Sequence, residues 1–278
     1  MTTTAVSFGG AAVVVTGGTR GLGRALGLEF SRAGASVYLT HRWGSADEAE
    51  VTAGFEREGL AAPRIIESDA SDPDDARALM REVGRHEAPL IAIVSNLAFA
   101  QIVSDMRELS RPTLELSLRY STWPILDLLR AAKETLGRYP RYALAISTDG
   151  GAVCHPGYDA VGIAKAALES LCRYLALHLR GEGVRVNAVR CGPLDTASSR
   201  ATFGDLLLDS EIAAREGLLL DPRSVGRACV ALCSGLMDSV TGQVITVDEG
   251  VSLLSPIHYL TGESWPGPFP ARDPEPGP

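Results

Sequence analysis

The chain has 278 residues, of which 45 % are hydrophobic, so it can bury one substantial core and we expect a single domain. Its formal net charge is −8, and lysines and arginines form no run along the chain. This balance excludes the basic surface that nucleic acids and anionic membranes attract, and we expect neither as a partner.

Short apolar runs typical of buried strands alternate with helical stretches. The predicted strands include residues 11–15, 37–39, 91–94, 143–146, 184–189 and 243–247. The predicted helices are residues 20–34, 45–59, 73–86, 112–137, 157–181 and 222–234. Strict alternation of strand and helix predicts an α/β fold, with a doubly wound, mostly parallel sheet and helices on both faces.

A glycine-rich turn, Thr16-Gly17-Gly18-Thr19-Arg20-Gly21-Leu22-Gly23, directly follows the first strand and precedes an amphipathic helix. Glycines permit a tight turn, let the backbone approach a pyrophosphate and aim the helix N-terminal amides at its negative charge. The order strand, turn, helix therefore predicts a dinucleotide site in a single-domain Rossmann fold. The predicted cofactor-binding residues of the turn are Gly17, Thr19, Arg20, Gly21, Leu22 and Gly23.

The end of the second strand bears on the choice between nicotinamide cofactors. NAD sites usually place an Asp or Glu there to hold the ribose 2′-hydroxyl, whereas this chain reads Thr40-His41-Arg42. Arg42, flanked by Arg20, can pair with a 2′-phosphate because a guanidinium suits phosphate geometry. We therefore predict NADPH; the alternative is that both arginines are solvated surface residues.

Tyr158 and Lys165 lie seven positions apart in a predicted helix. Seven residues make almost two helical turns, so both side chains share a face, about 10 Å apart along the axis. A lysine ammonium near the ring favours the phenolate and can bind ribose hydroxyls, and the phenol can give a proton to a carbonyl or enolate oxygen. Alternatively, Tyr158 is a capping aromatic and Lys165 only a ribose ligand.

Two segments interrupt the alternation. Residues 196–221 lie where substrate loops cluster in such sheets and are predicted to form a mobile lid; the alternative is an ordinary surface helix pair. Residues 255–278 form a proline-rich tail, predicted to be extended or disordered, in which Trp265 and Phe269 are candidates for docking. The predicted domain therefore spans residues 1–254.

Across residues 10–252 these motifs, in order, resemble the short-chain dehydrogenase/reductase family. Asp69-Ala70 follows the third strand like the family's adenine-contacting element, Asn96 ends the fourth strand, and residues 187–196 are similar to the family motif beside the nicotinamide. The resemblance implies a seven-stranded sheet and a homodimer or homotetramer built through long helices such as 112–137 and 157–181. The further cofactor-binding residues that it implies are Asp69, Ala70, Asn96, Lys165, Gly192, Pro193, Leu194 and Thr196.

The catalytic motif departs from that of most family members, which have Tyr four residues before Lys, where this chain has Val161. The Tyr-x6-Lys spacing resembles the divergent branch that includes bacterial enoyl-acyl-carrier-protein reductases, although their additional upstream tyrosine is absent. Ser147 stands close to the position of the family's catalytic serine and is the third predicted catalytic residue. His155 is either a substrate contact or an incidental loop histidine. The family's asparagine is missing around residues 117–120.

Three functions remain open. The favoured one is an atypical NADPH-dependent ketoreductase of polyketide or antibiotic biosynthesis, in which Tyr158 protonates the oxyanion, because some such enzymes resemble this pattern of eroded catalytic residues. The second is an enoyl-thioester reductase, favoured by the Tyr-x6-Lys spacing. The third is a non-catalytic NADPH-binding sensor or scaffold. The predicted partner is a small-molecule carbonyl substrate.

The cysteines indicate a reducing compartment. Their spacings match neither a zinc site nor a redox pair, so we expect them to be reduced and mostly buried, and no metal to be bound. They are Cys154, Cys172, Cys191, Cys229 and Cys233. The longest apolar run near the start, residues 11–15, is too short for a signal peptide or membrane span, and we expect a cytoplasmic enzyme.

Overall fold

The computed structural model describes residues 6–42, 46–86, 88–99, 101–103, 105–204 and 218–254. Its strands form one seven-stranded sheet in the order β3-β2-β1-β4-β5-β6-β7, and every neighbouring pair is parallel. The strands are β1 (Ala12–Val15), β2 (Ser36–His41), β3 (Arg64–Glu67), β4 (Leu90–Ser95), β5 (Tyr142–Thr148), β6 (Arg185–Cys191) and β7 (Val244–Val247). The predicted α/β fold is confirmed.

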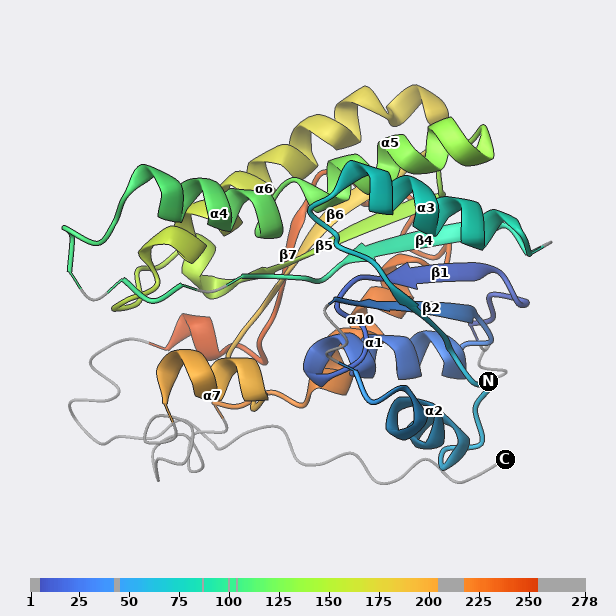
Figure 1. The fold of residues 1–278 in the computed structure, drawn as a ribbon, viewed down its shortest axis with the longest axis horizontal. Helices are drawn as coiled ribbons and strands as arrows, with labels where there is room; N and C mark the ends of the chain where they lie inside the picture. The colour runs from blue at the N-terminus through green and yellow to red at the C-terminus, as the bar shows by residue number, and fades with distance from the viewer. Residues whose placement is uncertain are drawn as a thin grey trace.

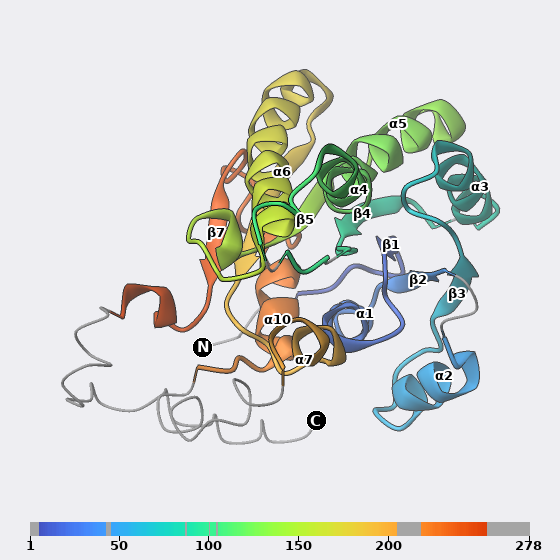
Figure 2. The same ribbon diagram turned by 60° about the vertical axis from the view of Figure 1, so that its left-hand side comes forward.

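Helices cover both faces of the sheet (Figures 1 and 2). One face carries α3 (Pro73–Gly84), α4 (Arg111–Ser121), α5 (Pro124–Leu136) and α6 (Asp159–His178). The other carries α1 (Gly21–Arg32), α2 (Glu48–Glu56), α7 (Ala197–Phe203) and α10 (Pro222–Leu232). Short 3-10 helices η1 (Asp149–Gly151), η2 (Arg180–Glu182) and η3 (Val251–Leu253) lie in the connections.

Strand β1 shows why the central strands read as unbroken apolar runs. Val13 and Val15 belong to the core on the side of α1, together with Phe30, whereas Val14 belongs to the core on the side of α3, together with Leu79. Alternate side chains of a strand point to opposite faces, so a strand covered on both faces is apolar at every position.

The structure corrects one predicted helix. Residues 112–137 form two helices, α4 and α5, which are separated at Thr122 and Trp123 because Pro124 begins a new helix. Proline lacks the N–H that an uninterrupted helix needs and is favoured in a first turn.

The segments outside the alternation are only partly described. The predicted lid, residues 196–221, begins with α7, but residues 205–217 lie outside the described residues, as does the predicted tail 255–278. The end of this segment contacts the residues just before it, because the amide of Leu220 donates to the carbonyl of Pro193 over 2.9 Å.

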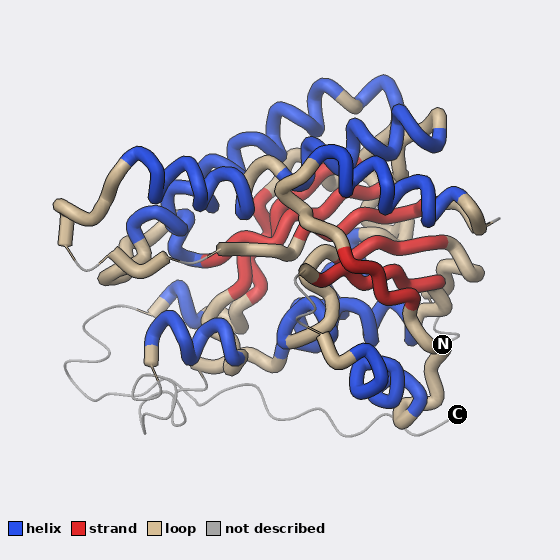
Figure 3. Tube along the Cα trace, viewed as in Figure 1, coloured by secondary structure: helices blue, strands red, loops and turns tan. Residues whose placement is uncertain are grey.

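Strand β1 lies between β2 and β4, the point at which successive connections diverge to opposite sides of the sheet. Because neighbouring strands are parallel, their carboxyl ends lie at one edge of the sheet. Figure 3 shows the loops that join the strand ends to the helices. Open parallel sheets bind ligands in the crevice at such a point, so this edge is where the site is expected.

Candidate active site

A cavity of about 390 Å³ lies at the carboxyl ends of β1, β2, β4, β5 and β6. The predicted site residues that line it are Gly17, Thr19, Arg20, Gly21, Leu22, Gly23, Arg42, Asn96, Tyr158, Lys165, Leu194 and Thr196. Those not among its described lining residues are Asp69, Ala70, Ser147, Gly192 and Pro193. The fold therefore brings the glycine-rich turn and the Tyr–Lys pair to one cavity.

The glycine-rich turn forms a cradle of exposed backbone, in which a side chain at the glycines would clash with neighbouring atoms. A Cβ at Gly23 would overlap the carbonyl oxygen of Gly17, and one at Gly18 would lie 2.7 Å from Cδ2 of Leu39. Asn96 braces the turn, since its Nδ2 donates to the carbonyl oxygens of Thr16 over 3.0 Å and of Gly17 over 3.3 Å. Backbone exposed in this way at the start of α1 fits a pyrophosphate.

Tyr158 stands at the N-terminal boundary of α6, with its ring against Gly150: a Cβ there would lie 2.5 Å from Cδ1 of the tyrosine. Burial raises the pKa of Tyr158, against the lowering effect of the neighbouring Thr148 hydroxyl, while the charge of Asp149 also raises it. The prediction that this site favours the phenolate is therefore wrong, and Tyr158 is held as a neutral phenol that can donate a proton.

Lys165 is only 1 % exposed. It lies about two turns into α6 and lines the same cavity. Its Nζ donates to the carbonyl oxygen of Ile146 over 2.7 Å. Burial lowers the pKa of Lys165 to about 8, because an ammonium loses its hydration there. The amine retains further hydrogen-bonding capacity toward a ligand in the cavity.

Ser147 does not face the cavity. Its side chain is buried, and its hydroxyl donates to Oε1 of Glu169 over 2.7 Å. Arg190 donates to the same Oε1 over 3.0 Å and to Oε2 of Glu169 over 2.7 Å. Successive residues of a strand point to opposite faces, so Thr148 takes the place beside Tyr158 that the sequence assigned to Ser147. The assignment of Ser147 as a catalytic residue is corrected accordingly.

Arg42 is held at the opposite end of the cavity. Its Nη1 lies 2.8 Å from Oδ2 of Asp69 and donates to the hydroxyl of Tyr120, whose ring centre lies 5.5 Å from the guanidinium. The other carboxylate oxygen of Asp69 accepts from the amide and hydroxyl of Ser71. Asp69 thus orients Arg42, and the adenine contact that the family resemblance implies for Asp69 and Ala70 stays a prediction. Ala70 is 4 % exposed.

His155 lies beside Tyr158, with ring centres 6.1 Å apart, and its Nε2 is 3.1 Å from Oδ2 of Asp149. It is not among the described residues that line the cavity. Of the predicted residues after β6, Leu194 and Thr196 line the cavity. Gly192 instead packs against Asp248, since a Cβ at Gly192 would lie 2.9 Å from Cβ of Asp248.

Sequence reasoning missed Tyr120, Thr148 and Glu169. Glu169 carried a usable signal, because an acidic residue four positions after Lys165, on the buried face of a helix, requires a partner. Tyr120 carried none, since its contact with Arg42 joins residues 78 positions apart.

Metal sites and membrane-spanning helices are not found in the described part of the chain. No group of three or more His, Cys, Asp or Glu side chains there has the arrangement of a metal site. Among the same residues, no helix has the length and apolar character needed to cross a membrane. All five cysteines are free, and Cys154 alone of them is exposed.

A doubly wound parallel sheet, a glycine cradle before α1 and a Tyr–Lys pair on one cavity define the class of dinucleotide-dependent oxidoreductases. The family model described as "Enoyl-(Acyl carrier protein) reductase" matches residues 17–252. The chain therefore belongs to the short-chain dehydrogenase/reductase family, as its motifs predicted.

Individual relatives are similar over most of their length. The 1-cyclohexenylcarbonyl-CoA reductase of Streptomyces collinus is 28 % identical over 94 % of this chain and 94 % of its own. The enoyl-[acyl-carrier-protein] reductase [NADPH] of Staphylococcus aureus is 28 % identical over 78 % and 86 %. The crystal structure of the enoyl-[acyl-carrier-protein] reductase (NADH) of Aquifex aeolicus covers 90 % of this chain and 99 % of its own, with 25 % identity and a TM-score of 0.78.

Proposed function

We propose that the protein is an NADPH-dependent reductase of α,β-unsaturated acyl thioesters. The observation that carries the proposal is the neutral phenol of Tyr158 on the same cavity as the glycine cradle and Lys165. The Tyr-x6-Lys spacing, the family match and the Streptomyces relative support a thioester over a ketone. This reverses the order in which the sequence alone ranked the two substrates.

The residues on the cavity fit a nicotinamide dinucleotide, which supplies a hydride when it is bound. The glycine-rich turn and Asn96 would hold the pyrophosphate, and Lys165 would hold ribose hydroxyls. Leu194 and Thr196 would flank the nicotinamide. Arg42 and Arg20 would bind the 2′-phosphate, which is the reason for proposing NADPH rather than NADH.

Tyr158 performs the proton step. Reduction of an unsaturated thioester at its β-carbon leaves an enolate, whose oxygen accepts the phenolic proton. A tyrosine is protonated at neutral pH, and burial raises the pKa of Tyr158 further, so the phenol is available for this transfer. Thr148 lines the same cavity as Tyr158, and its hydroxyl would help to orient the phenol.

Ketone reduction is the second candidate, and the neighbouring hydroxyls of Tyr158 and Thr148 favour it. Two donors at one end of the cavity suit a ketone oxygen, which must be held and then protonated. A ketoreductase of polyketide or antibiotic biosynthesis would use Tyr158 in the same role.

The absorbance of NADPH distinguishes these candidates when crotonyl-CoA and a panel of ketones are offered separately. The proposal predicts oxidation of NADPH that depends on crotonyl-CoA and is far slower with every ketone. Rapid oxidation with a ketone and none with crotonyl-CoA would establish the ketoreductase instead. Tight NADPH binding without turnover on either substrate would identify a non-catalytic sensor or scaffold.

A further inference from the structure

His41 is a buried side chain on the cavity to which neither the motifs nor the proposed reaction gives a role. It is the last residue of β2 and lies between Thr40 and Arg42, with its backbone fixed by pairing with β3. Its side chain is 4 % exposed, and it is among the residues that line the cavity.

The imidazole of His41 lacks a hydrogen bond. Neither Nδ1 nor Nε2 makes one to any residue that the structure describes; the carboxylate of Glu48 is 3.5 Å from Nε2, beyond good hydrogen-bonding distance. Leaving a buried polar group unsatisfied destabilises the fold, and most such groups in folded proteins have a partner. A ligand in the cavity can provide the partner that the fold does not.

The surroundings of His41 favour an anionic ligand. Arg20 and Arg42 line the same cavity, and Nη1 of Arg42 already contacts Asp69 and Tyr120. The carboxylate of Asp69 already pairs with Arg42 and that of Glu48 lies 3.5 Å from His41, so a bound phosphate benefits from neutral N–H donors in addition to the arginines. An imidazole N–H is such a donor.

The end of β2 is where Rossmann folds meet the 2′ position of the adenosine ribose. We propose that His41 is a specificity-determining residue that donates a hydrogen bond to the 2′-phosphate of NADPH. The inference rests on the proposed use of NADPH, but it is independent of the substrate and of Tyr158.

Adenosine fragments test this inference without any turnover. Adenosine 2′,5′-bisphosphate and AMP differ by the 2′-phosphate alone, and calorimetric titration gives the dissociation constant of each. For the wild-type protein we expect tighter binding of the bisphosphate. His41→Phe keeps a ring of similar size but removes the N–H, and we expect it to weaken bisphosphate binding about tenfold or more, since hydrogen bonds to charged groups are the stronger ones. AMP binding should change less than about threefold.

Two further variants separate a lost contact from a damaged fold. His178→Phe removes an exposed histidine at the end of α6 and should leave both affinities unchanged. His41→Asn keeps an N–H donor and should retain part of the preference for the bisphosphate. Equal losses for AMP and the bisphosphate in His41→Phe, or an undiminished preference, would overturn the role of His41 while leaving thioester reduction intact. A wild-type protein that binds both fragments equally would overturn the role of His41 and the choice of NADPH together.

Discussion

Gly150 has no side chain, and this leaves room for the ring of Tyr158. The ring of Tyr158 occupies the space that a Cβ would fill, and the main effect of adding one is to move the phenol. We expect Gly150→Ala to lower kcat about tenfold to a hundredfold, because a displacement of about 1 Å at a reacting group has effects of that size.

Cofactor affinity should be nearly unchanged in Gly150→Ala, since Gly150 is not among the described residues that line the cavity. Gly181→Ala is the matched control, because a Cβ there meets nothing within 4 Å. Steady-state kinetics and NADPH titration of both variants check the prediction, and an unaltered kcat in Gly150→Ala would contradict the described position of Tyr158.

Lys165 should contribute to function at the expense of stability. Its pKa falls from 10.5 in the unfolded chain to about 8 in the folded protein, because burial penalises the ammonium. The unfolded chain therefore binds more protons between these values, so the contribution of Lys165 to folding stability becomes more favourable as the pH rises from 8 to 10.5.

We therefore expect Lys165→Met to raise the free energy of unfolding at neutral pH by about 1–2 kcal/mol, after allowing for the lost hydrogen bond to Ile146. The advantage should shrink as the pH approaches 10.5. Urea denaturation of both proteins across this range measures the difference. A variant less stable than the wild type at neutral pH would show that the ammonium is better solvated than its burial implies.

Parts of the site could be predicted from sequence where the backbone requires a particular residue type or where a single helix sets the spacing. Gly17 and Gly23 are required by the backbone they leave open, and the spacing of Tyr158 and Lys165 is set by one helix. Ser147 and Thr148 could not be told apart, because a shift of one residue in a strand exchanges the two faces. The sign of the pKa shift of Tyr158 required its burial, which no local pattern reports.

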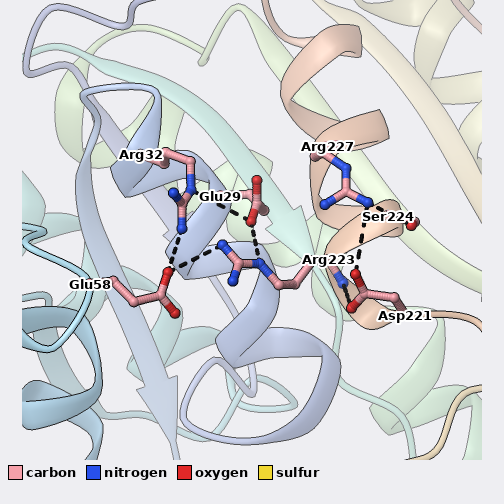
Figure 4. Close-up of polar contacts among 7 residues, drawn as sticks. All are labelled: Glu29, Arg32, Glu58, Asp221, Arg223, Ser224 and Arg227. Carbon is pink, nitrogen blue, oxygen red and sulfur yellow. Dashed lines mark hydrogen bonds and ion pairs between the residues drawn. The ribbon is translucent and has the colours of Figure 1, made fainter. Parts of the chain in front are cut away.

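At the scale of elements, α1 and α10 are joined by an ion-pair network (Figure 4). Glu29 of α1 is 6 % exposed, and its Oε1 accepts from Nε of Arg223 over 2.7 Å. Arg223 also donates to Glu58, which in turn pairs with Arg32. Gly226 lets the helices approach, since a Cβ there would lie 2.8 Å from Cγ of Glu29. The glycine-rich turn precedes α1, so this network supports the cofactor side of the cavity.

Arg223→Ala should destabilise the protein by about 1–2 kcal/mol, because it leaves the buried carboxylate of Glu29 with a weaker partner. Arg223 is partly exposed, so the loss should be smaller than for a fully buried ion pair. Arg227→Ala, on the same helix, removes a more exposed arginine whose contact with Asp221 is 3.8 Å, and should cost less than about 0.5 kcal/mol. Denaturant unfolding compares them, and equal losses would refute the importance of the Glu29 contact.

Most elements could be predicted because their signals are local. The central strands are apolar at nearly every position, and a capping Asp followed by proline marks the start of α3 and of α10. The division between α4 and α5 was signalled by Pro124, but the apolar periodicity continues across it and concealed the break. Which helices cover which face depends on contacts between distant segments, such as that of α1 with α10.

At the scale of the whole molecule, α6 carries an exposed apolar stripe. Ile163, Tyr174 and Leu177 are 44 %, 64 % and 71 % exposed. Their spacings of eleven and fourteen residues are close to three and four helical turns, so they share one face. Aligned apolar side chains of this kind are typical of association surfaces, and we propose that the protein is a homodimer or homotetramer that buries this stripe.

Replacing Tyr174 and Leu177 together by Glu should lower the molar mass measured by light scattering, because charges resist burial at an interface. Arg173→Glu, one position away on α6, changes charge without removing apolar surface and serves as the control. A monomeric wild-type protein at micromolar concentration would contradict the proposed association.

In the proposed reaction, Tyr158 gives the proton while the rest of the cavity binds the cofactor. The most direct test measures thioester-dependent NADPH oxidation and NADPH affinity in the same Tyr158→Phe protein. We predict that kcat falls about a hundredfold or more, as expected for the loss of a general acid, while the dissociation constant of NADPH changes less than about threefold. A kcat within about threefold of the wild-type value would show that another group donates the proton.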